Sequence, residues 1–310
     1  MTARLAQRPL GRSGRTVSAL GLGCASYWAK PRFPEARARA VLAAALEAGI
    51  TLYDTGASYA HGHAEVRLGR LLRELGADPD ALVIGTKVGT VADRRGRLVK
   101  DFRPESVTAQ VRASLERLGL ERIALLQLHG PEPDDLTEEL LSALERLRDD
   151  GVVDLLGING FAPVIRHATG LAPFDVLMPF LSVMEPGNAA LVRAAAETGQ
   201  GVLVAGPLAR MAFAPPLARW LTRPSGLWYL ARAVRHGPGP LLRARALRPA
   251  LRAPGWTPAE LALAWVLEQP GVASAVFGTT TPAHVTALTE AAHLPLPDTV
   301  RAAVARVHGL

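Results

Sequence analysis

Eight short apolar runs alternate with eight segments of helical periodicity, and this alternation limits the possible folds more than any other feature. The predicted strands span residues 19–22, 52–54, 82–87, 123–129, 155–159, 175–180, 201–205 and 274–277. The predicted helices span residues 35–47, 65–75, 104–118, 136–150, 163–169, 188–198, 258–268 and 282–292. Repeated βα units require a parallel sheet, and this number of units predicts an α/β fold closed into a (β/α)₈ TIM barrel. No Gly-x-Gly-x-x-Gly follows the first run, which disfavours an open Rossmann sheet.

Two further segments are expected to modify the barrel. Residues 8–10 and 16–17 flank a Gly-Arg-Ser-Gly turn, which predicts an N-terminal β-hairpin closing the bottom of the barrel. Residues 207–256 form a long insertion after the seventh strand, and an insertion at this end of a barrel predicts a lid or binding loop. This insertion contains arginines and no Asp or Glu, so we expect it to cover an anionic ligand. We expect residues 1–310 to form a single domain.

Composition excludes several classes of protein. The single cysteine, Cys24, cannot form an intramolecular disulfide or a cysteine-ligated metal site, and it is predicted to be a buried small residue. No segment has the apolar length of a membrane span and no signal peptide is recognisable, so a soluble, cytoplasmic protein is expected. The net charge of +7 is concentrated in the insertion without a nucleic-acid-binding motif, so no nucleic-acid partner is predicted. His61 and His63 lack further residues at ligand spacing, so no metal site is predicted.

Four polar residues lie at or just after the ends of three consecutive predicted strands. Asp54 ends the second strand, Tyr59 lies in the following loop, Lys87 ends the third strand and His129 ends the fourth. Each alone could be a helix cap or an ordinary hydrogen-bond partner. Because a TIM barrel carries its active site at the carboxyl ends of its strands, their joint occurrence predicts a catalytic group.

The chemistry of this group follows from its charges. The ammonium of Lys87 would favour the phenolate form of Tyr59 and so make the phenol a stronger acid. Asp54 would hold Lys87 charged and oriented, while His129 would donate a hydrogen bond to a carbonyl oxygen. This arrangement suits protonation of an alkoxide while a hydride adds to the carbonyl carbon.

Along nearly its whole length, the chain resembles the aldo-keto reductase superfamily. The similar passages are residues 8–14, 17–23, 48–50, 53–55, 59–62, 65, 68–69, 86–89, 126–129, 206–209 and 278–280. The resemblance implies a (β/α)₈ barrel that binds a nicotinamide dinucleotide, NADP(H) or NAD(H), without a Rossmann fold. It also implies a catalytic tetrad of Asp54, Tyr59, Lys87 and His129.

The resemblance further implies which residues contact the cofactor. These are Gly23, Asn159, Met178, Gly206, Leu208, Gly278, Thr279, Thr280 and His284. The chain departs from the family here, since Asn159-Gly160 replaces Ser-Asn, Met178 replaces a carboxamide-binding Gln, and the ring-stacking aromatic aligns with Leu181. Thr280 and Leu288 occupy the positions that, in the family, often bind the 2′-phosphate and the adenine of the cofactor. These departures predict fewer specific contacts to nicotinamide.

Trp28 follows the first strand. It is either a core residue or part of the wall of the substrate pocket, and we expect it to line the pocket.

The leading hypothesis is an oxidoreductase that interconverts a small-molecule carbonyl and its alcohol. One alternative is a non-redox lyase, dehydratase or isomerase on the same fold, in which Tyr59 and Lys87 transfer protons. Another is a regulatory binding protein derived from the reductase fold. The substrate, the reaction direction and the oligomeric state do not follow from the sequence.

Overall fold

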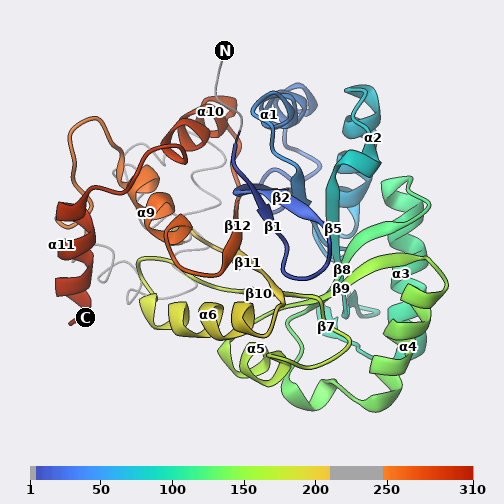
Figure 1. Ribbon diagram of the computed structural model, residues 1–310. Helices are drawn as coiled ribbons and strands as arrows, with labels where there is room; N and C mark the ends of the chain where they lie inside the picture. Colours follow the sequence, from blue (N-terminus) through green and yellow to red (C-terminus); the bar gives the residue numbers. More distant parts are fainter. Residues whose placement is uncertain (1–4, 210–246, 310) are drawn as a thin grey trace.

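Eight parallel strands form the wall of a closed barrel in the computed structural model, which describes residues 5–209 and 247–309 (Figure 1). In chain order they are β3 (Leu20–Gly23), β4 (Leu52–Asp54), β5 (Val83–Val88), β8 (Ile123–His129), β9 (Val153–Gly160), β10 (Val176–Pro179), β11 (Gly201–Ala205) and β12 (Val272–Phe277). Each strand pairs with its neighbours in chain order, and β12 pairs with β3 to close the ring. The predicted (β/α)₈ TIM barrel is confirmed.

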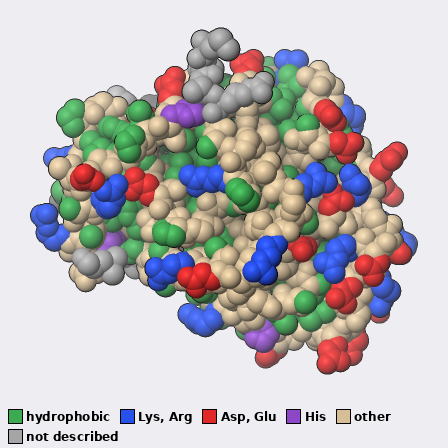
Figure 2. All heavy atoms as spheres, viewed as in Figure 1, with side chains coloured by type: hydrophobic (Ala, Val, Ile, Leu, Met, Phe, Trp, Pro, Cys, Tyr) green, Lys and Arg blue, Asp and Glu red, His purple; other side chains and the backbone are tan. Residues whose placement is uncertain are grey.

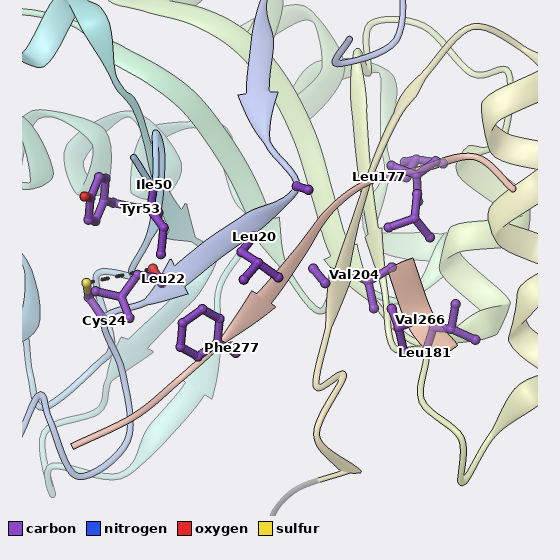
Figure 3. Close-up of a cluster of buried hydrophobic side chains, with 14 of the residues drawn as sticks. Leu20, Leu22, Cys24, Ile50, Tyr53, Leu177, Leu181, Val204, Val266 and Phe277 are labelled. Atoms are coloured by element: carbon purple, nitrogen blue, oxygen red, sulfur yellow. Dashed lines mark hydrogen bonds between the residues drawn. The ribbon is translucent and has the colours of Figure 1, made fainter. Parts of the chain in front are cut away.

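The two-residue alternation of each strand separates two apolar layers. Inward-facing side chains such as Leu52, Val83, Leu125 and Val176 fill the barrel in one buried cluster. The intervening residues point outward and form a second cluster with the surrounding helices. Figure 3 shows part of this outer layer, in which Leu20, Leu22, Tyr53 and Phe277 belong to three neighbouring strands. A polar residue near the carboxyl end of a strand therefore points into the barrel mouth when it lies an even number of residues from an inward-facing one.

In the described part of the chain, eight helices follow the strands and cover the outside of the barrel (Figure 1). They are α1 (Glu35–Glu47), α2 (His63–Glu74), α3 (Pro104–Leu118), α4 (Glu138–Asp149), α5 (Ala162–Ala168), α6 (Ala189–Glu197), α9 (Pro258–Leu267) and α10 (Pro282–Ala291). Thr257 and Glu260 form a capping box at the start of α9. Thr281, at the start of α10, makes no side-chain capping hydrogen bond. Short 3₁₀ turns occur in the connections at Pro79–Ala81, Pro133–Asp135 and Pro186–Asn188.

The predicted N-terminal hairpin is formed by β1 (Gln7–Pro9) and β2 (Thr16–Ser18), which pair antiparallel. Leu10 and Val17 are fully buried in the inner cluster, so the hairpin closes the bottom of the barrel as expected. Its turn packs against the start of β11, since the Arg12 amide donates to the Gly199 carbonyl at 2.8 Å. A Cβ on Gly11 would lie 2.3 Å from the Gly201 nitrogen, so only glycine fits this close approach.

Two structural features are absent from the sequence-based prediction. A second hairpin, β6 (Thr90–Ala92) and β7 (Leu98–Lys100), follows β5, and a final helix, α11 (Asp298–His308), follows α10. Most of the insertion, residues 210–246, lies outside the described residues, and so does the lid predicted for it. Just after this gap, Leu247, Ala250 and Leu251 are buried in the outer cluster.

The outer surface carries charges of both signs. In the view of Figure 2, Lys and Arg side chains are interspersed with Asp and Glu side chains over the right-hand side of the molecule. Charged side chains also form ion pairs, including Arg70 with both Glu35 and Glu74. Within residues 5–209 and 247–309, no helix is long and apolar enough to cross a bilayer.

Candidate active site

A cavity of about 620 Å³ opens at the carboxyl ends of the barrel strands. Every strand contributes a residue from its end to the wall of this cavity: Gly23, Asp54, Lys87, His129, Asn159, Met178, Ala205 and Phe277. The connecting loops add Trp28, Tyr59, Gly206 and Leu208. All four predicted catalytic residues are therefore brought together in one cavity.

Lys87 and Asp54 form a buried ion pair at the floor of this cavity. The Lys87 ammonium donates to Asp54 Oδ2 at 2.5 Å and to the Thr55 carbonyl at 2.7 Å, and its side chain is only 1% exposed. Burial opposes the charge of Lys87, but Asp54 and then Tyr59 outweigh this effect, so the pKa of Lys87 lies above its usual value. Lys87 is therefore a fixed cation at neutral pH.

Gln127 fixes the other oxygen of the carboxylate, and the sequence-based prediction missed this residue. Its Nε2 donates to Asp54 Oδ1 at 3.0 Å, and the whole side chain is buried. Its Oε1 has no hydrogen-bond partner within the described chain. The strand alternation could have identified Gln127. It lies two residues before His129 on the same strand, so the two side chains face the same side of the strand, the barrel interior.

Tyr59 lies over the ion pair. The Lys87 Nζ is 5.1 Å from the centroid of the Tyr59 ring, and the His129 ring meets the Tyr59 ring edge-on at 5.5 Å between centroids. The loop that carries Tyr59 is anchored to the neighbouring strand, because the Ala57 amide donates to the Lys87 carbonyl at 3.0 Å. A Cβ on Gly56 would lie 3.4 Å from the Tyr59 ring, so the ring packs closely over this loop.

His129 is neutral in this environment. Burial, followed by the positive charges of Lys87 and Lys100, lowers the pKa of His129 to about 3. Ser58 Oγ lies 3.4 Å from His129 Nδ1, and Lys100 donates to the His129 carbonyl. A neutral imidazole has one N–H donor, so His129 is suited to donate a hydrogen bond rather than a proton. Ser58 and Lys100 were not among the predicted site residues.

Most of the residues implied for the cofactor line the same cavity. They are Gly23, Asn159, Met178, Gly206, Leu208, Gly278 and Thr279. The other two lie outside the cavity wall: the Thr280 carbonyl accepts a hydrogen bond from Arg37, and His284 Nδ1 lies 3.1 Å from Thr279 Oγ1. Asn159 Nδ2 donates to the Met178 carbonyl at 3.0 Å, so part of its amide already has a partner within the protein.

An aromatic residue does lie in this part of the cavity, at the position before the one inferred by alignment. Leu181 is 1% exposed and belongs to the outer core layer (Figure 3). Phe180 instead lines the cavity, and its ring stacks on that of Phe161 at 5.1 Å between centroids. The alignment behind the expectation for Leu181 was therefore displaced by one residue from the aromatic side chain.

Trp28 is both a core residue and a wall of the cavity. It is 2% exposed, its indole nitrogen donates to the Ala38 carbonyl at 3.3 Å, and it lines the cavity. The loop around it is held by the buried Arg67, which donates to the carbonyls of Trp28, Lys30 and Phe33. The two readings of Trp28 are thus compatible.

The remaining sequence candidates take no part in the cavity wall. Cys24 is fully buried with its Sγ 3.9 Å from the Leu22 carbonyl, and burial followed by Asp54 raises the pKa of its thiol (Figure 3). His63 Nδ1 lies 3.1 Å from the Ala29 carbonyl. Among the described residues, no group of His, Cys, Asp and Glu could hold a metal ion.

Comparison with known proteins agrees with this geometry. Residues 19–308 match the aldo/keto reductase family. The chain belongs to this family. This aldo/keto reductase is 34% identical over 220 residues to a D-threo-aldose 1-dehydrogenase from Pseudomonas, a match that spans 62% of this chain and 66% of that protein. It is also 29% identical to an NADH-specific methylglyoxal reductase from Escherichia coli, with 94% of each chain covered.

Solved structures of the family have the same fold as this aldo/keto reductase. The holo form of the aldo-keto reductase AKR11C1 from Bacillus halodurans is 26% identical, with 98% of this chain and 96% of that chain covered and a TM-score of 0.79. The glycerol dehydrogenase AKR11B4 from Gluconobacter oxydans is 25% identical, with 97% and 94% covered and a TM-score of 0.75. The family and the names of these relatives support a carbonyl oxidoreductase.

Proposed function

We propose that this aldo/keto reductase is an NADP(H)- or NAD(H)-dependent oxidoreductase that interconverts a small-molecule carbonyl and its alcohol. Asp54, Tyr59, Lys87 and His129 are its catalytic residues. The observation that carries the proposal is the buried Lys87 ammonium, which is held by Asp54 and lies beneath the Tyr59 ring. A tyrosine next to a fixed cation is a more effective proton donor than a free tyrosine.

In this proposal each residue has one task. Tyr59 gives its hydroxyl proton to the substrate oxygen as that oxygen becomes an alkoxide, and takes the proton back in the reverse direction. Lys87 stabilises the phenolate that remains, and Asp54 keeps Lys87 charged and in place. His129, neutral at working pH, donates an N–H to the carbonyl oxygen and orients it toward Tyr59.

The cofactor is proposed to lie along the ends of β9 to β12. Asn159 and Met178 would border the nicotinamide, while Gly206, Leu208, Gly278 and Thr279 would border the rest of the molecule. Gly206 lies in this wall beside the Phe180 ring, and its φ of 67° favours glycine, so its backbone is open to a ligand without a side chain in between. A bound nicotinamide dinucleotide would supply the hydride.

A second candidate is a non-redox enzyme that uses Tyr59 and Lys87 for proton transfer alone. It is favoured by one observation: the Met178 side chain offers a carboxamide only a weak acceptor and no donor, and the Asn159 amide donates to the backbone. Under this hypothesis the cavity would bind substrate without a need for nicotinamide.

One experiment separates the two candidates. Purified protein is mixed with NADPH or NADH and a panel of aldehydes, and the loss of reduced-nicotinamide absorbance is followed. The oxidoreductase predicts substrate-dependent oxidation of at least one cofactor, and Tyr59→Phe should abolish it. If neither cofactor binds and no oxidation occurs with any aldehyde, the proposal is wrong and proton-transfer chemistry is favoured.

A further inference from the structure

The lysines of this chain have an unusual distribution. The sequence contains 32 arginines but three lysines, Lys30, Lys87 and Lys100. All three line the cavity at the barrel mouth. Elsewhere the chain uses arginine for its positive charges, so the cavity is the one place where it uses lysine. Lysine differs from arginine in presenting a compact point charge on a flexible stem.

Of the three lysines, Lys100 is the one that contacts the backbone of His129. It ends β7, and its ammonium donates to Thr90 Oγ1 at 3.1 Å and to the His129 carbonyl. An ammonium has three protons to donate, so one remains for a ligand. Its charge also contributes to lowering the pKa of His129, which places it within electrostatic reach of that imidazole.

The charges facing this region leave it positive. The cavity wall contains one carboxylate among the described residues, Asp54, and Lys87 already neutralises it. Burial lowers the pKa of Lys100 below its usual value, and Asp135 and then Glu132 partly offset this effect. His129 adds no charge because it is neutral. An anionic group entering near His129 would therefore meet Lys100 without an opposing carboxylate in the wall.

Lys100 is also separated from Gly278 and Thr279, two of the residues proposed for the cofactor. The barrel order runs β10, β11, β12, β3, β4, β5, β8, β9, so the loops after β12 and β5 are separated by two strands. Gly278 and Thr279 follow β12, while the β6 and β7 hairpin follows β5. Lys30, on the loop after β3, lies nearer to the cofactor side.

We propose that Lys100 is a specificity-determining residue that binds an anionic oxygen group, a carboxylate or a phosphate, on the carbonyl substrate. This inference rests on the proposed function and names its substrate class: small aldehydes or ketones with a negatively charged substituent. The carbonyl oxygen lies between Tyr59 and His129, and the anionic substituent extends toward β7.

The test compares anionic aldehydes with neutral partners of similar size. The pairs are succinic semialdehyde with its methyl ester, and glyceraldehyde 3-phosphate with glyceraldehyde, so the two arms distinguish carboxylate from phosphate. In Lys100→Met, kcat/KM for the preferred anionic substrate should fall by about tenfold or more, because a charge-assisted hydrogen bond is lost. Because Lys100 also donates to the His129 carbonyl, kcat/KM for the neutral partner should fall as well, but by a much smaller factor. The KM of the cofactor should be nearly unchanged, and Lys100→Arg should recover most of the activity.

Arg97→Met is the matched control. Arg97 belongs to the same hairpin and pairs with Asp93 outside the cavity, so its loss removes an equal charge without changing the discrimination. Equal losses for the anionic and neutral partners would overturn the inference and indicate a structural role for Lys100. A loss confined to the KM of the cofactor would also overturn it and assign Lys100 to the cofactor phosphates.

Binding of 4-hydroxybutanoate, measured by calorimetry, separates failure of this inference from failure of the proposed function. If the wild type reduces no aldehyde but binds 4-hydroxybutanoate, and Lys100→Met loses that binding, the anion site stands and the reductase function is wrong. If neutral aldehydes are reduced and no anionic substrate is preferred, the function stands and the anion site is wrong. If the wild type reduces no aldehyde and does not bind 4-hydroxybutanoate, the proposed function and the anion site are both wrong.

Discussion

Lys87 and Asp54 form a buried ion pair in which both charged groups also have a backbone or amide partner. The ammonium donates to the Thr55 carbonyl as well as to Asp54, and the carboxylate accepts from Gln127 as well as from Lys87. Removing one charge from such a pair leaves the other buried without compensation. The pair should therefore act as one unit in catalysis and in stability.

A double-mutant cycle tests this coupling. Lys87→Met should reduce kcat by several orders of magnitude, because Tyr59 loses its adjacent cation. Adding Asp54→Asn to that variant should reduce kcat little further, since the carboxylate acts through Lys87. Steady-state kinetics of the two single variants and the double variant measure the interaction. Multiplicative losses in the double variant would show that the two residues act independently.

Tyr59→Phe should separate turnover from binding. The substitution removes only a hydroxyl, so the ring can keep its packing over Lys87 and against His129. Turnover should fall by roughly 10²–10⁴-fold, the usual contribution of a general acid, while the Kd for the cofactor stays nearly constant. Retention of wild-type turnover would remove Tyr59 from its proposed role.

His129 should make the protein sensitive to acid. Its pKa is lowered to about 3 in the folded protein, so below about pH 6.5 the unfolded chain binds a proton that the folded chain does not. The stability contributed by the neutral imidazole is present above about pH 6.5 and is lost as the pH falls toward 3, by roughly 1.4 kcal/mol for each pH unit. Denaturant unfolding gives the free energy of unfolding of the wild type and of His129→Asn at each pH. Plotted against pH, the two curves should converge as the pH falls. Parallel curves would indicate an unperturbed histidine.

Cofactor recognition should be weaker at the nicotinamide than the family resemblance implies. The thioether of Met178 offers a carboxamide no useful hydrogen bond, whereas a glutamine offers both a donor and an acceptor. Met178→Gln should therefore strengthen binding of NADPH and NADH by about 0.5–1.5 kcal/mol, as measured by fluorescence titration. Met178→Leu is the control and should bind like the wild type. A wild type that already binds NADPH tightly and selectively would contradict this expectation.

The barrel itself was predictable from the sequence because its signals are local. Strands β4, β8 and β11 and helices α1 and α3 have the predicted bounds, and in the other barrel strands and helices no end shifts by more than two residues. Gly119 and Gly199, which follow α3 and α6, adopt the left-handed conformation that commonly ends a helix. The hairpin of β6 and β7 was missed because its strands are three residues long and lack a buried apolar face.

The site was predictable only in part. Asp54, Lys87 and His129 were visible because chemically distinctive side chains end their strands. Gln127 was missed because a neutral amide inside an apolar strand carries no such signal, although its partner Asp54 explains why it is there. Lys100 could not be placed without the hairpin that carries its ammonium to the His129 carbonyl.

The central claim, that a hydride passes from a nicotinamide to a carbonyl carbon in this cavity, has one direct test. The wild type is incubated with an aldehyde and each reduced cofactor carrying deuterium at the nicotinamide C4 position, and the alcohol is examined by mass spectrometry and NMR. With both C4 hydrogens of the cofactor replaced by deuterium, the account predicts one deuterium on the carbinol carbon, and no labelled product with Tyr59→Phe. Alcohol without deuterium, or conversion of the substrate without any nucleotide, would contradict it.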